Sequence, residues 1–199
     1  MARRDFSEVS CSIARALEII GDRWTLLVLR DLFVGVTRFD DIRRDLGIAT
    51  NVLTERLALL TDHGVVERRE YQAHPPRHDY LLTEKGRDLF PVLAALVGWG
   101  DRWEADDTGP PALLVHDRCG QVSTPVTRCA CCGEPMSADD VTPIAGPGHR
   151  TGRGTEMIGP ILAARAESSA AGAPRRHTRG PRCDDQADLQ GAELLHRPS

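Results

Sequence analysis

The chain has 199 residues and a formal net charge of -4, and it contains no apolar run long enough to span a membrane. The negative charge argues against a protein that coats nucleic acid nonspecifically, because that mode of binding neutralises many phosphates. Residues 1–5 lack the hydrophobic stretch of a secretion signal. We therefore expect a cytoplasmic protein with no membrane partner.

All nine aromatic residues lie between Phe6 and Trp103. The chain beyond Trp103 therefore has few large apolar side chains to offset the entropy of ordering, which is about 1 to 2 kcal/mol per residue. We expect one compact N-terminal domain over residues 7–107, followed by a Cys/His-rich segment over residues 109–149. Residues 150–199 are rich in Arg, Ala, Gly and Pro and are expected to be mostly disordered, with a short helix around Ile158 to Glu167.

Two helices are expected near the N-terminus, from Cys11 to Ile20 and from Trp24 to Phe33. Two shorter amphipathic helices follow, from Arg38 to Leu46 and from Ile48 to Gly64, and the turn between them contains Gly47. Their spacing is that of a helix-turn-helix. The apolar face of the first is formed by Phe39, Ile42 and Leu46, and that of the second by Leu53, Leu57 and Leu60.

The next segment predicts a β-hairpin and then a helix. Strand-like residues run from Val65 to Tyr71 and from His78 to Leu82, with a proline-rich loop from Ala73 to Arg77 between them. A long helix is expected from Thr83. One stripe of this helix carries Val92, Leu96, Trp99 and Trp103, which a single monomer would have difficulty covering.

The order of these elements defines a winged helix-turn-helix, mainly α with a small β-hairpin. Five motifs occur along it: Cys11, Gly21 to Leu27, Arg38-Phe39, Leu53 to Leu57, and Pro75 to Gly86. Through these motifs the sequence resembles the HxlR-type family of bacterial transcriptional regulators over about residues 7–107. The family usually has Glu where this chain has Asp79. The resemblance implies a homodimeric DNA-binding regulator whose first and terminal helices form the dimer interface.

The second helix of the pair carries the residues that we expect to read DNA. Asn51 can pair with the edge of adenine, and Thr54 offers a hydroxyl and a methyl group. The alternative is that Thr50 and Asn51 only cap the helix. Glu55 either accepts a hydrogen bond from cytosine or is a solvated charge. Arg56 either contacts a phosphate or braces the helix through a nearby acid.

Two further arginines are expected to contact the DNA backbone. Arg38, at the start of the first helix of the pair, has the same two alternatives as Arg56. Arg77 lies in the loop of the hairpin, where a phosphate or an adjacent minor groove is within its expected reach. The alternative for Arg77 is an exposed loop whose charge is incidental.

In a cytoplasmic protein, six cysteines are better explained by metal binding or reactive thiols than by structural disulfides. His116 with Cys119, and Cys129 with Cys132, form two pairs of zinc-ligand spacing, which predict a structural zinc ribbon. Cys131 is the substitute ligand in the second pair. The alternatives are ordinary thiols and a redox disulfide.

Cys11 precedes the first helix and is either a redox sensor, as in some HxlR-type regulators, or a small buried hydrophobic residue. The sequence contains no credible catalytic constellation, so we do not expect an enzyme. The leading hypothesis is a sequence-specific transcriptional regulator that binds a palindromic operator as a homodimer, responding to an undetermined small-molecule or redox effector. The alternative is a winged-helix protein-interaction module with a structural zinc ribbon and no specific DNA target.

Overall fold

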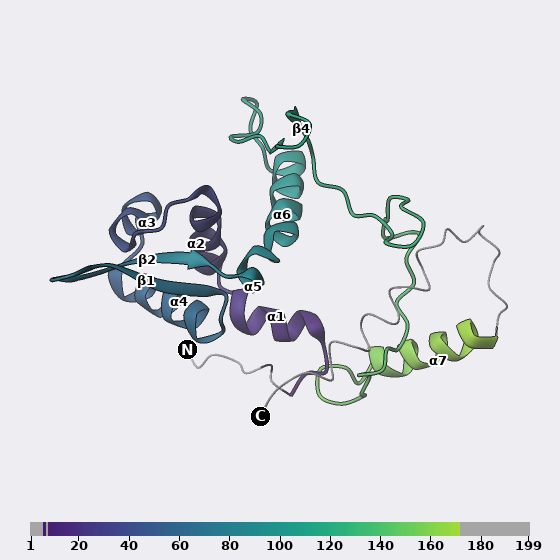
Figure 1. The fold of residues 1–199 in the computed structure, drawn as a ribbon. Coiled ribbons are helices and arrows are strands. Elements are labelled where there is room, and N and C mark those ends of the chain that lie inside the picture. Colours follow the sequence, from purple (N-terminus) through teal and green to yellow (C-terminus); the bar gives the residue numbers. More distant parts are fainter. Residues whose placement is uncertain (1–5, 7, 172–199) are drawn as a thin grey trace. The chain divides into compact units, whose positions relative to one another are not determined.

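The computed structural model describes residues 6 and 8–171 (Figure 1). The chain divides into two compact units, Met1–Pro125 and Val126–Ser199. Residues 172–199 of the expected disordered tail, with Cys183, lie outside the described residues. Within the described part of the chain, no helix is long and apolar enough to cross a membrane.

The first unit follows the predicted order of elements (Figure 1). Its helices and strands are α1 Ser12–Ile20, α2 Arg23–Val34, α3 Phe39–Leu46, α4 Thr50–Asp62, β1 Val66–Ala73, β2 Pro76–Leu82, α5 Glu84–Arg87, α6 Phe90–Trp103, β3 Val115–His116 and β4 Gln121–Val122. Strands β1 and β2 pair antiparallel, as do β3 and β4. The second unit contains α7 Ile158–Ala171, which extends four residues beyond the helix predicted there.

The core of the first unit lies where α2, α3 and α4 meet the base of the β1–β2 hairpin. Its fully or almost fully buried side chains are Val28, Leu29, Ile42, Leu53, Leu57, Leu60, Val65 and Val66. Phe39 and Leu46 pack against this cluster and are partly buried. The predicted apolar faces of α3 and α4 are thus confirmed, and each buried leucine contributes about 1.5 to 3 kcal/mol through the apolar surface it removes from water.

The turn between α3 and α4 is as predicted, but the cap of α4 is not. Gly47 ends α3 with a φ of 60°, a left-handed conformation that glycine adopts without strain. Ala49, and not Thr50, is the N-cap of α4, and this N-cap makes no side-chain capping hydrogen bond. The predicted capping by Thr50 is therefore wrong. Ile48 is buried in the core, which fixes the chain so that the helix begins one residue earlier than a Thr50 cap requires.

The hairpin is longer than predicted, because both strands extend into the proline-rich segment. Ala73 pairs with Pro76, which leaves only His74 and Pro75 in the turn. The Gln72 side chain closes this turn by donating to the carbonyl oxygens of His74 and Pro75, at 3.0 and 3.2 Å. We call this hairpin, residues 66–82, the wing.

The predicted long helix from Thr83 is wrong, because it is divided into α5 and α6. Thr83 caps α5 by accepting a hydrogen bond from the Gly86 backbone N–H at 3.1 Å. Pro91, in the first turn of α6, has no N–H and favours a helix start at this point. On α6, Trp99 and Trp103 are 58% and 62% exposed, so the described residues leave the tryptophan stripe uncovered, as expected.

Helix α5 is fixed to the base of the wing. The Thr83 hydroxyl donates to the Gly64 carbonyl oxygen at 2.7 Å, and Lys85 Nζ donates to the His63 carbonyl oxygen at 2.7 Å. Gly86 lies so close to the Val65 carbonyl oxygen that a methyl group in its place would collide with it. These contacts hold α5, which precedes α6, against the end of α4 and the beginning of the wing.

Candidate nucleic-acid interface

The N-terminal part of α4 presents a polar edge to solvent. Thr50, Asn51, Thr54 and Glu55 are exposed, whereas Leu53, between them in sequence, is fully buried. The Thr54 hydroxyl donates to the Thr50 carbonyl oxygen at 2.8 Å, which leaves its methyl group and its lone pairs for an external contact. The Asn51 amide has no hydrogen-bond partner within the described part of the chain. This edge has the polarity and exposure that a base-reading surface requires.

Arg56 does not share this edge, although it also lies on α4. Its side chain is only 13% exposed, and its guanidinium lies 3.6 Å from Asp22 and 3.1 Å from Glu55. Asp22 is the N-cap of α2 and accepts a hydrogen bond from the Trp24 backbone N–H at 2.9 Å. Of the two alternatives for Arg56, this geometry favours the brace, which links α4 to the start of α2. Glu55 is correspondingly a partner of Arg56 as well as an exposed carboxylate.

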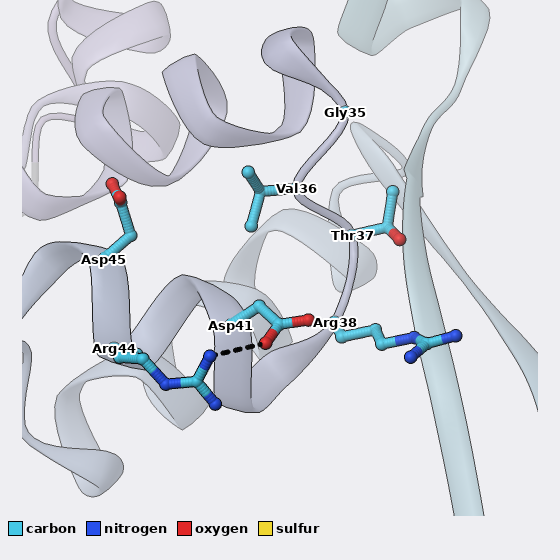
Figure 2. A pocket seen from close by; sticks show the side chains of 7 residues that line it. All are labelled: Gly35, Val36, Thr37, Arg38, Asp41, Arg44 and Asp45. Carbon is cyan, nitrogen blue, oxygen red and sulfur yellow. Dashed lines mark hydrogen bonds and ion pairs between the residues drawn. The ribbon is translucent and has the colours of Figure 1, made fainter.

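A second set of contacts joins the wing to the segment that leads into α3. The Thr37 hydroxyl donates to Asp79 Oδ1 at 2.9 Å, and the Tyr80 backbone N–H donates to the Thr37 carbonyl oxygen at 2.8 Å. Arg38 lies 3.9 Å from the same Asp79 carboxylate and places its guanidinium 4.9 Å from the centre of the Tyr71 ring. The wing and α3 are therefore held together. Figure 2 shows Thr37 and Arg38 on the segment between α2 and α3.

Arginine side chains gather between α3 and the wing. Arg38, Arg44 and Arg77 line a cavity of about 340 Å³ there. Arg44 is paired with Asp41 at 3.2 Å (Figure 2), whereas Arg77 has no ion-pair partner among the described residues. An unpaired guanidinium on an exposed wing is suited to a phosphate oxygen. Sequence reasoning selected Arg38 and Arg77 but missed Arg44 and the contacts of Asp79, although the departure from the family at position 79 pointed to that residue.

The predicted metal ligands are divided between the two units. His116 and Cys119 lie at the β3–β4 turn of the first unit, with 3.3 Å between His116 Nδ1 and Cys119 Sγ. Cys129 and Cys132 lie in the second unit, where the backbone N–H of Cys132, together with that of Cys131, lowers the pKa of the Cys129 thiol. No three His, Cys, Asp or Glu side chains in the described ranges form a group that could hold a metal ion.

Cys11 is half-buried at the start of α1 and is a free cysteine. It occupies the N-cap position without making a side-chain capping bond. Neither of its two predicted roles, sensor or small hydrophobic residue, is tested by this placement, and both stay predictions.

Comparisons with known proteins agree with this architecture. The sequence profile of the HxlR-like helix-turn-helix family matches residues 19–108. An uncharacterized HTH-type transcriptional regulator of Mycobacterium tuberculosis is 46% identical over 139 residues, which cover 70% of this chain and 88% of the relative.

Two solved structures are also similar. The crystal structure of PA1607, described as a candidate transcription factor, has a TM-score of 0.63 and 36% identity, and the match covers 70% of this chain and 97% of that chain. PA1374 from Pseudomonas aeruginosa, described in the same way, has a TM-score of 0.50 and 39% identity over 69% of this chain and 93% of its own. Since the winged helix-turn-helix and the sequence likeness agree, the chain belongs to the HxlR-like helix-turn-helix family and is a transcriptional regulator.

Proposed function

We propose that the protein binds a specific DNA operator, with α4 in the major groove and the wing on the adjacent backbone. The observation that carries this proposal is the exposed edge of α4, where Asn51 and Thr54 face solvent while Leu53 is buried. Asn pairs with adenine through two hydrogen bonds, and such a pair contributes about 1 to 3 kcal/mol of discrimination between bases. Arg38 and Arg77, which line the cavity between α3 and the wing, supply positive charge for phosphates.

We further propose that the operator is palindromic and is bound by a homodimer. The tryptophan stripe of α6, together with the exposed Ile13 and Leu17 of α1, provides apolar surface for a second copy. A twofold dimer presents two equivalent α4 helices to two half-sites of opposite orientation. The resemblance to HxlR-type regulators supports the same pair of helices as the interface.

Selection of binding sites from random DNA, followed by footprinting, tests the operator. We expect one enriched palindrome, and we expect Asn51→Ala to weaken its binding by about 1 to 3 kcal/mol while leaving nonspecific binding unchanged. His63→Ala is the control, because His63 is an exposed residue at the C-terminal end of α4, and this variant should retain wild-type affinity. An equal loss for Asn51→Ala on all sequences would reject base reading by Asn51.

Salt dependence separates DNA binding from the protein-interaction alternative. Affinity should fall steeply with salt, because each neutralised phosphate releases counterions, and Arg77→Ala should reduce the slope of log affinity against log salt by about 0.9. A folded protein that enriches no sequence and binds DNA without this dependence would favour the protein-interaction module.

We also propose that His116, Cys119, Cys129 and Cys132 bind one structural zinc ion. The support is chemical: two ligand pairs of equal spacing, each followed by a glycine of positive φ, 67° at Gly120 and 78° at Gly133. Mass spectrometry of protein purified without chelators should find one zinc ion per chain, and the Cys132→Ser variant should lose most of it. If wild-type protein contains no zinc even after it is refolded in the presence of zinc, the site is refuted.

A further inference from the structure

A largely apolar cavity of about 470 Å³ lies between α2 and α6 and is bordered by residues 111–114. Its main apolar walls are Leu26, Phe33, Phe90, Leu93, Val97 and Leu114. The rings of Phe33 and Phe90 contact each other with 5.9 Å between their centroids. The Leu114 carbonyl oxygen accepts a hydrogen bond from the Ser123 backbone N–H at 2.8 Å, which ties the bordering segment to the β3–β4 hairpin. The size and the lining are those of a small-molecule site.

The cavity and the stripe formed by Val92, Leu96, Trp99 and Trp103 share Leu96, but they are centred on different faces of α6. Leu93, Val97 and Asp101 recur every four residues along the cavity wall. With about 100° of rotation per residue, Trp99 lies about 160° around the helix from Val97, and Trp103 the same angle from Asp101. A second copy that covers the tryptophans therefore leaves the centre of this cavity to another occupant.

The charged groups of the cavity favour a cation. Arg30 is one of its lining residues, but the guanidinium is already paired with two carboxylates, at 2.7 Å from Asp31 and 3.0 Å from Asp45. Asp101 also lines the cavity, is half-buried, and has no hydrogen bond or ion pair within the described ranges. The uncompensated charge at the apolar surface is thus negative.

We propose that this cavity binds a lipophilic cation, with the apolar groups of the ligand against α2 and α6 and its positive charge facing Asp101. Apolar surface supplies most of the binding energy at such a site, and a single carboxylate selects the sign of the charge. The ligand would act as an effector through Arg30, which lines the cavity and pairs with Asp45 of α3. This effector role rests on the proposed function. Ligand binding itself does not depend on DNA.

Tetraphenylphosphonium and tetraphenylborate test the proposal, because the two ions have nearly the same shape and opposite charges. Binding to the full chain is measured by isothermal titration calorimetry without DNA. Tetraphenylphosphonium should bind, and tetraphenylborate should bind at least about tenfold more weakly. Asp101→Asn should weaken the cation about tenfold, whereas Asp107→Asn, which removes the same charge outside the cavity, should have no effect.

Val97→Trp provides a second test, since the larger side chain fills the cavity without changing its charge. Circular dichroism confirms that each variant is folded, and a folded Val97→Trp protein should lose tetraphenylphosphonium binding. Equal affinity for the two ions, or an Asp101→Asn protein with wild-type affinity, would overturn the proposal. A wild-type protein that binds neither ion would also overturn the proposal. Loss of self-association in the Val97→Trp variant would overturn it too, because a second copy would then be the occupant of the cavity.

Discussion

Replacing Arg56 by Met tests whether this residue braces the fold or contacts DNA. The methionine keeps most of the apolar stem and removes the charge that lies 3.6 Å from Asp22. The Asp22 side chain is 36% exposed, so solvent screening limits the ion pair to about 0.5 to 1 kcal/mol. We expect Arg56→Met to lower the free energy of unfolding by about 1 kcal/mol. Arg56→Ala should cost about 2 to 3 kcal/mol, because it also removes buried methylene groups.

Asp22→Asn completes the measurement, because asparagine caps a helix about as well as aspartate and lacks the charge. Urea unfolding of the two single variants and the double variant, followed by circular dichroism, should give a coupling energy of about 0.5 to 1 kcal/mol. DNA binding at several salt concentrations is measured on the same proteins. An Arg56→Met protein with wild-type stability, but with a salt slope reduced by about 0.9, would show that Arg56 contacts a phosphate and would refute the brace.

Three other predictions follow from the packing of the first unit. Leu53→Ala, at a fully buried position of α4, should lower the free energy of unfolding by about 2 to 5 kcal/mol in urea denaturation, whereas Leu113→Ala, at a residue that is 61% exposed, should change it by less than about 0.5 kcal/mol. Trp99→Glu should convert the proposed homodimer to a monomer in analytical ultracentrifugation, and self-association equal to that of the wild type would exclude the tryptophan stripe from the interface. Burial raises the pKa of Asp31 against the opposing effect of Arg30, so its contribution to stability is greatest below its unfolded-state pKa and is lost as pH rises through the folded-state pKa. The stability of the wild type relative to Asp31→Asn should therefore fall as the pH of urea unfolding rises from about 3, and a constant difference would contradict this assignment.

The helix-turn-helix was predictable because its signals are local. Leu53, Leu57 and Leu60 repeat with the helical period, and Gly47 supplies the positive φ of the turn between α3 and α4. The exposure of Asn51 and Thr54 followed from the same period. The wing was predicted as a hairpin but too short, because a proline at the first residue of a strand, as Pro76 is in β2, does not interrupt the pairing.

The contacts that organise the candidate interface were less accessible from the sequence. Thr37 and Asp79 are 42 positions apart, and no local pattern indicates their hydrogen bond. The pairing of Arg56 with Asp22 likewise depends on how α4 packs against the start of α2. The division between α5 and α6 was missed because residues 83–88 carry no large apolar side chain and so give no period that could mark the end of α5, although Pro91 was a local signal for a new helix start.

The attachment of α5 to the base of the wing has a consequence for the choice of operator. Thr83, Lys85 and the close contact at Gly86 fix α5 to the base of the wing, a few residues before α6 begins at Phe90. Two chains joined through α6 would therefore have their two α4 helices set at a defined separation. Operators would then be discriminated by the number of base pairs between half-sites as well as by the bases themselves.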